Sequence, residues 1–455
     1  MNRTSRIGRR ALLRVAAGAP ALALLRGAPA HAAAAIERVS SPGGIQAWLI
    51  VDRSLPLLSL EFNFRGGAAT LPAGKEGLAP MTASLLTEGA GDLDTQAFNA
   101  IKEDRSISLG FGGGVDAMTG SLRTLTRHRD EAVRLAALAL NQPRFDAAAI
   151  ERARARMTAA VQRGANDPQT LASRLWFRTA FPDHPYGRRV NGSVESLAGL
   201  TRDDIAAFHR ARFARDNLVI GAVGDIDAAG LGALLDRIFG GLPARAAPND
   251  VPAATMAGTG QTLVLQRPLP QTYVLFGEPG LLRADPDFYV ATVMNHILGG
   301  GGFSARLMLE VRERRGLTYG VSSGLAAYDR SGLILGSFSS DNARAAEALA
   351  IVRAEWRRMA NDGVTAEELA DAKSNINGSF PLGLDSTARL AGTLASIQYQ
   401  DLGIDYIERR PSYIDAVTRA DIQRVARRLL DADRLLVVAV GQAAGLAGTP
   451  VQDAG

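Results

Sequence analysis

The spacing of hydrophobic and polar positions divides the chain into two successions of elements. Each succession opens with short β-rich runs, at 45–51 and 57–64 and again at 262–266 and 272–277. Segments with the period of amphipathic helices follow, and each succession closes on an apolar strand of Val, Leu and Ile. Strands before and after a block of helices predict α+β domains, each a mainly antiparallel sheet with helices packed on it.

The two successions are also related in sequence. Three independent pairings occur in the same order, at offsets of 214 to 219 residues, which indicates an internal duplication. We therefore predict two homologous domains, 36–241 and 261–445, joined by an exposed linker at 242–260 that is rich in Pro, Ala and Gly. The paired segments are 51–56 with 265–270, 145–150 with 364–369, and 200–224 with 417–441.

The N-terminal segment 1–32 has the pattern of an export signal. Five arginines precede an apolar run at 15–25, no acidic residue occurs before Glu37, and Ala30-His31-Ala32 fits a cleavage site. The pair Arg9-Arg10 resembles a twin-arginine signal. An uncleaved membrane anchor is the alternative, although the run is shorter than the ~20 residues that a bilayer requires. We expect a periplasmic protein with no transmembrane segment in the mature chain.

The amino-acid composition excludes several kinds of site and partner. The chain has 455 residues, of which 47% are hydrophobic and 21% charged, as in a soluble globular protein. It contains no cysteine, which excludes disulfides, thiolate metal sites and a cysteine nucleophile. The net charge of +5 comes from arginines interspersed with acids, without a basic stripe, so nucleic acid is not an expected partner.

Several short motifs occur in order along both halves. They are Gly77-Leu78-Ala79, His184-Pro185-Tyr186-Gly187, Asn295 to Gly300 (NHILGG) and Arg312 to Tyr319 (RERRGLTY). Together they resemble the insulinase/pitrilysin family of zinc metallopeptidases, which includes mitochondrial processing peptidase and related bacterial two-subunit enzymes. The resemblance implies two homologous domains that form half of a clamshell around a cavity, with peptide as the substrate class.

The resemblance also shows what this chain lacks. The family has His-x-x-Glu-His directly after Gly-Leu-Ala, with two zinc ligands and a general base on one helix face. Here Pro80, Ala83 and Ser84 occupy those three positions. Proline offers no ligand atom, alanine cannot take a proton, and serine is a poor zinc ligand beside imidazole. We predict that the chain binds no metal and that its motif is catalytically degenerate.

The family's third ligand is missing as well. It is a Glu that would fall near 159–162, yet no Glu occurs between Arg152 and Val194. The five histidines are isolated in sequence, so a zinc site could arise only from residues that are distant along the chain. The resemblance to two-subunit enzymes implies that zinc is bound by a homologous partner subunit.

The second half retains one feature of the family, an Arg/Tyr pair. In catalytic members, an Arg and a Tyr seven positions later hold the substrate backbone near the zinc, and Arg312 and Tyr319 keep that spacing. The pattern predicts an amphipathic helix over 304–315, a left-handed cap at Gly316 and a strand from Leu317. The alternative is that Arg312 only favours the helix C-terminus and that Tyr319 is ordinary strand packing.

A run of four glycines, Gly299, Gly300, Gly301 and Gly302, precedes this pair. Consecutive glycines are unfavourable in a helix, so we predict a loop between two helices. The run resembles the glycine-rich loop with which the noncatalytic processing-peptidase subunit helps to admit substrate. A plain flexible turn is the alternative; no Gly-Lys-Ser/Thr follows, which argues against a phosphate site.

The sequence is compatible with three hypotheses for the function. The leading hypothesis is a noncatalytic subunit of a heterodimeric zinc metallopeptidase, inactive alone, that binds peptide and supplies Arg312 and Tyr319 to a partner's zinc site. The second is a catalytically silent scaffold or peptide-binding protein of the same fold. The third, a self-sufficient hydrolase of another mechanism, requires a constellation of Ser, His and Asp or paired carboxylates that the sequence does not reveal.

Overall fold

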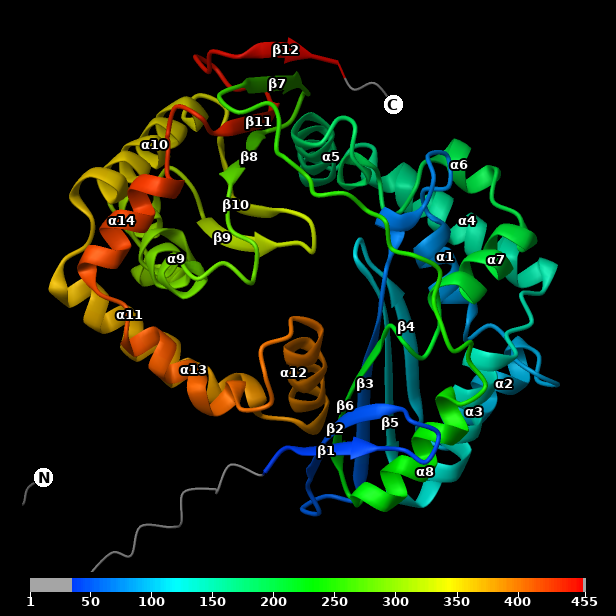
Figure 1. Cartoon of the computed structure of the whole chain (residues 1–455). Coiled ribbons are helices and arrows are strands. Elements are labelled where there is room, and N and C mark those ends of the chain that lie inside the picture. The colour runs from blue at the N-terminus through cyan, green and yellow to red at the C-terminus, as the bar shows by residue number, and fades with distance from the viewer. Residues whose placement is uncertain (1–34, 453–455) are drawn as a thin grey trace, which may run out of the picture. The chain divides into compact units, whose positions relative to one another are not determined.

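The computed structural model describes residues 35–452, so the predicted export segment lies outside the described residues. The strands are β1 (Glu37–Ser40), β2 (Gln46–Val51), β3 (Leu57–Arg65), β4 (Ser108–Gly113), β5 (Ala117–Leu125), β6 (Leu218–Gly224), β7 (Thr262–Gln266), β8 (Gln271–Pro279), β9 (Val321–Ala327), β10 (Gly332–Asp341), β11 (Leu436–Gly441) and β12 (Thr449–Val451). Figure 1 shows their arrangement.

The α-helices fall between these strands. They are α1 (Leu78–Leu85), α2 (Thr95–Asp104), α3 (Arg129–Asn141), α4 (Ala147–Gly164), α5 (Pro168–Ala180), α6 (Val194–Ala198), α7 (Arg202–Arg212), α8 (Ala228–Phe239), α9 (Phe288–Asn295), α10 (Ala345–Asp362), α11 (Ala366–Ser379), α12 (Thr387–Tyr399), α13 (Tyr406–Asp415) and α14 (Arg419–Leu429). Within the described residues, no helix is both long and apolar enough to cross a bilayer.

The strands form two six-stranded sheets, in the orders β1-β2-β6-β3-β5-β4 and β12-β7-β11-β8-β10-β9. Most neighbours are antiparallel. The parallel pairs are β2 with β6, β7 with β11, and β7 with β12. The predicted α+β fold, with two mainly antiparallel sheets that each carry helices, is confirmed.

The sequence repeat corresponds to a repeat of strand positions. β6 lies between parallel β2 and antiparallel β3, and β11 lies between parallel β7 and antiparallel β8. The sheets differ at one edge, where β1 pairs with β2 antiparallel and β12 pairs with β7 parallel. The expected equivalence of 217–224 and 434–441 is therefore confirmed.

Local sequence explains why the repeated helices begin where they do. Thr201 caps α7 and Thr418 caps α14, each accepting a hydrogen bond from the backbone three residues on. Asp204 and Asp421 bond back to the cap residue and complete a capping box in both halves. The repeated Thr-Arg-x-Asp sequence thus encodes the same helix start twice.

Each sheet has its own apolar core on one face. In the first half, the ring of Phe62 meets that of Phe239 edge-on, with centroids 5.1 Å apart. In the second half, Phe276 meets Trp356 in the same way at 5.5 Å. These fully buried aromatic pairs fix helices against the two sheets.

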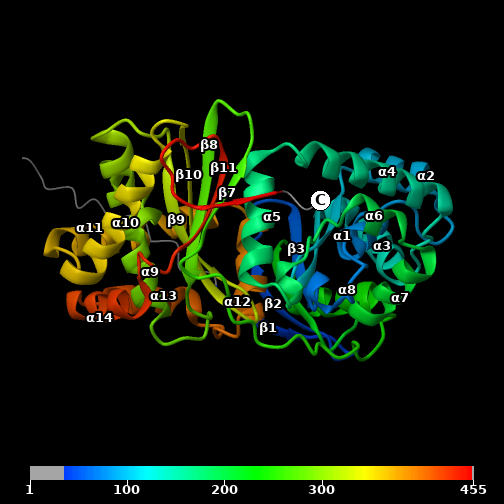
Figure 2. The same ribbon diagram turned by 90° about the horizontal axis from the view of Figure 1, so that it is seen from above.

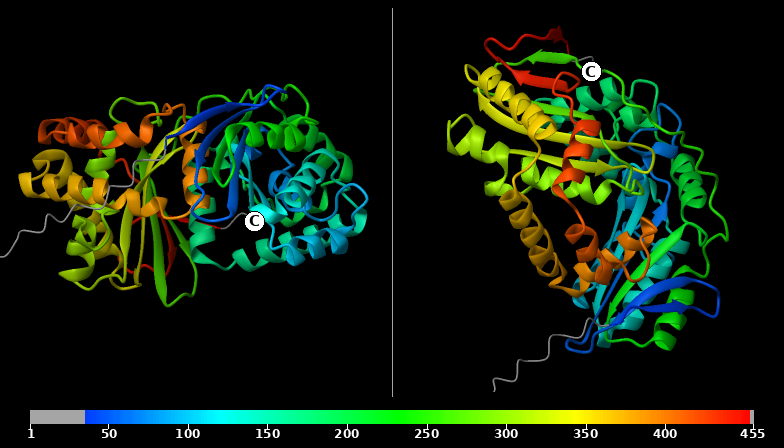
Figure 3. Two further views of the ribbon diagram at one scale, coloured as in Figure 1. Left: turned by 90° about the horizontal axis from the view of Figure 1, so that it is seen from below. Right: turned by 60° about the vertical axis from the view of Figure 1, so that its left-hand side comes forward.

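The other face of each sheet is covered by a helix from the opposite half. α5 of the first half packs on β8 and β11, and α12 of the second half packs on β3 and β6. Figures 2 and 3 show α5 and α12 apart from the remaining helices of their own halves. The buried indole of Trp176 in α5 donates to the carbonyl oxygen of Leu436 at 3.0 Å. We call α5 and α12 the exchanged helices.

Glycine permits the close approach of α12. A Cβ at Gly221 in β6 would lie 2.1 Å from the carbonyl oxygen of Ala391 and 2.8 Å from the amide nitrogen of Ala395. Because both atoms belong to the α12 backbone, only a residue without a side chain fits there.

The segment 242–260 contains no regular helix or strand, and most of its residues are exposed. It nevertheless makes specific contacts. Met256 is buried in the cluster around Trp176, and the amide of Ala257 donates to the carbonyl of Ala180 at 2.8 Å. The segment predicted as an exposed linker is thus attached along its length to both halves.

Candidate functional site

The degenerate metal motif lies on α1. Gly77 precedes the helix with a φ of +92°, which favours glycine, and Pro80 lies in the first turn, where its missing N–H breaks no helical bond. Ser84 donates to the carbonyl of Met81 at 2.8 Å, and Ala83 is buried in the core. None of these side chains presents an imidazole or a carboxylate.

Pro80 and Ser84 line a cavity of about 760 Å³, which we call the α1–α4 cavity. Ala160 and Val161 of α4 line it too, within the segment where the sequence places the missing third ligand. The fold therefore brings the three expected ligand positions to one cavity, but the side chains there cannot bind zinc. Among residues 35–452, no group of three or more His, Asp or Glu side chains could hold a metal ion.

The histidines of the described chain have separate surroundings. His209 is buried between Phe145 and Phe213, and burial lowers its pKa to about 4. His184 accepts a hydrogen bond from the amide of Tyr186 through Nδ1, and its Nε2 lies 3.1 Å from the carbonyl oxygen of Pro252. Burial also lowers the pKa of His296. His209 and His184 thus have ring or hydrogen-bond contacts within the protein that account for their positions.

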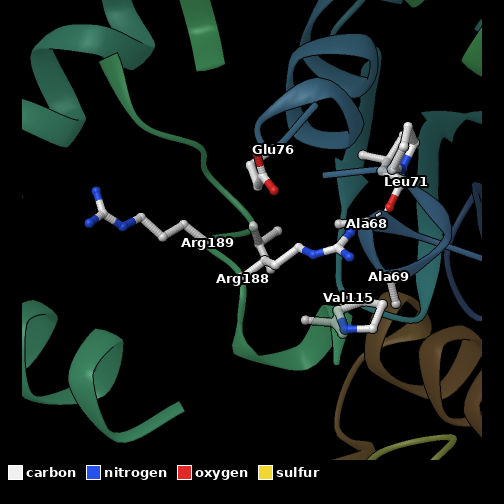
Figure 4. Close-up of a pocket in the computed structure, with 10 residues that line it drawn as sticks. Ala68, Ala69, Leu71, Glu76, Val115, Arg188 and Arg189 are labelled. Carbon is white, nitrogen blue, oxygen red and sulfur yellow. Dashed lines mark hydrogen bonds between the residues drawn. The ribbon is translucent and has the colours of Figure 1, made fainter. Parts of the chain in front are cut away.

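Four of the five charged residues that line the α1–α4 cavity are arginines, and the fifth is Asp167. Arg156 comes from α4, Arg174 from α5, and Arg188 and Arg189 from the loop after Gly187. Figure 4 shows a small neighbouring pocket that shares Arg188 and Arg189 with this cavity; there Arg188 donates to the carbonyl of Leu71 at 2.7 Å, while Arg189 extends to the opposite side. Sequence analysis did not predict this concentration of arginines, because the four residues come from three separate segments.

A polar network joins the β4–β5 and β9–β10 turns beside the cavity. The hydroxyl of Tyr186 donates to Asp116 at 2.8 Å and accepts from the amide of Arg330 at 2.9 Å. Tyr399 of α12 donates to Asp329 at 2.7 Å. Burial, followed by the charge of Asp116, raises the pKa of Tyr186, so this phenol stays a neutral donor. The network holds the two halves together next to the cavity.

The region of the Arg/Tyr pair differs from the predicted helix. A 3-10 turn at Gly302–Ser304 and a π-helix at Met308–Glu313 replace one continuous helix over 304–315. Gly316 has a φ of +59°, so its predicted left-handed conformation is confirmed. The strand β9 begins at Val321, and Tyr319 therefore lies in the loop before it rather than within a strand.

Arg312 and Tyr319 lie on the surface. The Arg312 guanidinium stacks over the ring of Phe303 at 4.7 Å and is 3.6 Å from Glu313. Tyr319 is 88% exposed and Phe303 is 67% exposed, which is unusual for aromatic side chains. Neither Arg312 nor Tyr319 is among the residues that line the α1–α4 cavity.

The glycine run is not the loop that the sequence predicts. Gly299 and Gly300 end a π-helix, His296–Gly300, and Gly299 is buried. A Cβ at Gly299 would lie 2.3 Å from Ser323 Oγ in β9, and one at Gly301 would lie 2.7 Å from the His296 carbonyl oxygen. Only Gly302 has a positive φ and open space around it. The first three glycines thus allow close packing, which is why helix propensity alone misplaces them.

Known proteins agree with this fold. Residues 199–376 match the family model described as the peptidase M16 inactive domain. The crystal structure of a peptidase M16 inactive domain from Pseudomonas fluorescens superposes with a TM-score of 0.84 at 28% identity, covering 91% of this chain and 99% of that one. The chain belongs to the M16 peptidase family. The insulinase-type resemblance is thereby confirmed.

M16 relatives differ in how they are described. An uncharacterized zinc protease of Mycobacterium tuberculosis is 32% identical over 273 residues, which span 58% of this chain and 61% of that protein. A non-peptidase homolog of Helicobacter pylori is 26% identical over 373 residues, 81% of this chain and 85% of that one. A chain of complex III from Candida albicans shares the fold alone, with a TM-score of 0.74 at 15% identity. Proteins with the M16 fold thus also occur within larger complexes.

Proposed function

We propose that this chain is the noncatalytic subunit of a heterodimeric zinc metallopeptidase. In this proposal a homologous partner carries the zinc, and this chain supplies Arg312 and Tyr319 to the partner's active site in a periplasmic complex. The observation that carries it is the contrast between a motif without ligands at Pro80 and Ser84 and an Arg/Tyr pair left accessible at the surface.

The chemistry of the pair fits this role. An arginine fork binds a peptide carbonyl or a developing oxyanion, and a phenol donates a second hydrogen bond to the same group. Tyr319 has 88% of its surface free, and stacking on Phe303 limits the freedom of the Arg312 side chain. Both groups are thus available to a partner without any rearrangement of the core.

The test mixes variants of this chain with the zinc-bearing homologue that the proposal requires. Arg312→Ala and Tyr319→Phe are expected to lower peptide turnover by a factor on the order of 10²–10³, the scale of one lost oxyanion donor. Arg314→Ala is the matched control, because Arg314 is in the same segment but pairs with Glu310. Complex formation, followed by gel filtration, should not change.

A scaffold without a catalytic role is the second candidate, favoured by the relative described as a non-peptidase homolog. The same experiment separates the two functions. Unchanged turnover in an intact complex would leave the scaffold as the better explanation, whereas lost complex formation would make the pair structural. The isolated chain is expected to hold no stoichiometric zinc and to cleave no peptide, and elemental analysis that found one zinc per chain would contradict this.

A further inference from the structure

We propose that the cavity among α9, α12 and α13 binds a small carboxylic acid that carries an aromatic ring. Arg283 and Arg410 hold the carboxylate, and aromatic side chains surround the ring. We call this space the α9–α13 cavity; it measures about 250 Å³ and shares no lining residue with the α1–α4 cavity. Neither Arg312 nor Tyr319 lines it. The inference is therefore independent of the proposed function.

The charged residues of the α9–α13 cavity are two arginines. Arg283 and Arg410 line it, and none of the lining residues is Asp or Glu. Within residues 35–452, neither guanidinium forms an ion pair. Two positive charges thus lie at one cavity without a carboxylate to compensate them.

The acids nearby along the chain do not supply that carboxylate, because they pair with other arginines. These ion pairs are Asp285 with Arg428 at 2.9 Å, Asp287 with Arg424 and with Arg428, each at 2.7 Å, and Asp405 with Arg409 at 2.9 Å. Glu408 of α13 is exposed and lies outside the cavity. The positive charge at the cavity is therefore left for a ligand.

Both guanidinium groups keep hydrogen-bond donors that the protein does not use. Arg283 donates through Nε to Gln400 at 2.9 Å. Through Nη2 it donates to the phenol oxygens of Tyr289 at 2.9 Å and Tyr406 at 3.2 Å, and its Nη1 makes no bond within the described chain. The Arg410 side chain makes no hydrogen bond to any residue of 35–452, although its Nη1 is buried. Buried donors without a partner are uncommon, and a ligand oxygen would satisfy this one.

The fold brings the two arginines to one part of the cavity. Tyr406 and Arg410 are four residues apart on α13, so they lie on the same face of that helix, and Tyr406 binds Arg283. Burial, followed by the neighbouring Tyr406 phenol, raises the pKa of Tyr289 to about 12, so this acceptor of Arg283 stays neutral. A planar carboxylate has two oxygens that accept charge-assisted bonds from more than one guanidinium.

Aromatic side chains line the same cavity. The Arg283 guanidinium is 4.3 Å from the ring centroid of Phe288, and that of Arg410 is 4.2 Å from the centroid of Phe380. A ligand ring placed beside these rings gains edge-to-face or stacked contacts. The volume of about 250 Å³ is slightly below the roughly 300–1,000 Å³ of sites for drug-sized ligands. The ligand is therefore a small aromatic acid or the C-terminal aromatic residue of a peptide.

The experiment measures binding of 3-phenylpropionate to the purified chain by calorimetry. The uncharged 3-phenylpropionamide should bind at least roughly tenfold more weakly, the scale of lost hydrogen bonds to a charged group. Acetate, which has the carboxylate but no ring, should also bind at least roughly tenfold more weakly, because no ring is buried. A tripeptide that ends in phenylalanine with a free carboxylate, compared with its amide, tells whether a free acid or a chain end is the ligand.

Variants assign the binding to the α9–α13 cavity. Arg283→Gln and Arg410→Gln should each weaken 3-phenylpropionate by roughly tenfold. Arg409→Gln is the matched control, because Arg409 is the neighbouring residue of α13 but is exposed, pairs with Asp405 and lies outside the cavity. Ser396→Phe should abolish binding, since Ser396 lines the cavity at an exposed position of α12 and the larger side chain leaves both arginines in place.

Four results would overturn the proposal. They are no binding of 3-phenylpropionate at millimolar concentration, equal affinity for the acid and its amide, equal affinity for acetate, and binding that survives Ser396→Phe. Circular dichroism of each variant checks the fold. If Arg283→Gln does not fold because it loses its bonds to three helices, Arg410→Gln and Ser396→Phe still decide the question, since the Arg410 side chain makes no hydrogen bond within residues 35–452.

Discussion

Each half contains a cavity beside its helices, and the two cavities differ in size. In the first half, the α1–α4 cavity measures about 760 Å³ and is open between α1, α4 and α5. In the second half, the α9–α13 cavity measures about 250 Å³. There the Arg283 guanidinium stacks over Phe288 at 4.3 Å and lies 5.0 Å from the Tyr289 ring.

The comparison shows what duplication preserves and what it leaves to vary. Strand order and helix caps recur because the backbone pattern requires them in both halves. The space between helix and sheet depends on individual side chains, and it measures about 760 Å³ in the first half and about 250 Å³ in the second. A cavity retained after its metal ligands are lost is therefore a property of the first half and not of the fold.

The largest effect is expected from restoring a metal site in the α1–α4 cavity, which tests whether the first half still positions three zinc ligands together. The triple variant Pro80→His, Ala83→Glu, Ser84→His is expected to stay without tightly bound zinc and without activity, because a third ligand is missing. Adding Val161→Glu, which lines the same cavity, should produce stoichiometric zinc by elemental analysis. Gln162→Glu in its place is the control, since Gln162 lies outside the cavity. Equal zinc in both would mean that α4 does not supply the third position.

The exchanged helices offer a second test, of whether the halves are separable. Trp176→Ala should cost about 3–5 kcal/mol and Leu394→Ala about 2–5 kcal/mol in the free energy of unfolding, because both side chains are fully buried. Leu382→Ala, at a site that is 73% exposed, should be nearly neutral.

Urea denaturation of the Trp176→Ala variant reports on each half, since Trp48 lies in the first and Trp356 in the second. Both indoles should respond in a single transition. Two separate transitions would show that each half is stable alone and that the exchanged helices are not required for folding.

A third test concerns one position at which the sheets differ. Phe64 is an apolar core residue of β3, and the offset of 214 residues puts Glu278 of β8 at the equivalent position. Burial raises the pKa of Glu278 from its ordinary 4.5 to about 8, although Trp356 and the Asp431 amide donate to its carboxyl group. The folded state therefore favours the protonated form.

Glu278 therefore makes the folded state more stable at low pH than at high pH. A raised folded pKa contributes stability that is fully present below pH 4.5 and is lost as the pH rises through about 8. The wild-type protein should lose on the order of a few kcal/mol over this range, and Glu278→Gln should remove most of the dependence. Urea midpoints measured across the range check this, and parallel curves for the two proteins would exclude Glu278 as the source.

The smallest expected effect is at the network between the halves. Tyr399→Phe removes the bond to Asp329 and should cost about 1 kcal/mol in the free energy of unfolding. Tyr413→Phe on the exposed side of α13 is the matched control. A loss at Tyr399 no greater than at Tyr413 would mean that this bond contributes nothing to holding the halves together.

The sequence predicted those features that depend on residues close together along the chain or on the repeat. Repeat offsets predicted two similar sheets, Gly316 predicted a left-handed residue, and Pro80, Ala83 and Ser84 predicted a motif without ligands. Periodicity could not predict that α5 and α12 pack on the opposite half, because an apolar helix face does not specify which sheet covers it. The roles of Arg312 and Tyr319 stay predictions.

The misplaced segments have a common cause. The π-helix at His296–Gly300 depends on Ser323, which is distant in sequence and leaves no room for a side chain at Gly299. The arginines of the α1–α4 cavity likewise gather only after α4 and α5 have packed. Such contacts are decided by tertiary structure, and no window of neighbouring residues contains them.

The exchange of helices has a consequence for synthesis on the ribosome. β6 is complete at Gly224, but α12, which covers its apolar face, begins only at Thr387. At about 5–20 residues per second, the intervening ~160 residues leave that face uncovered for roughly 10–30 s. The nascent chain therefore exposes a β-rich apolar surface while its second half is made. Holdase chaperones should bind it most strongly during this interval.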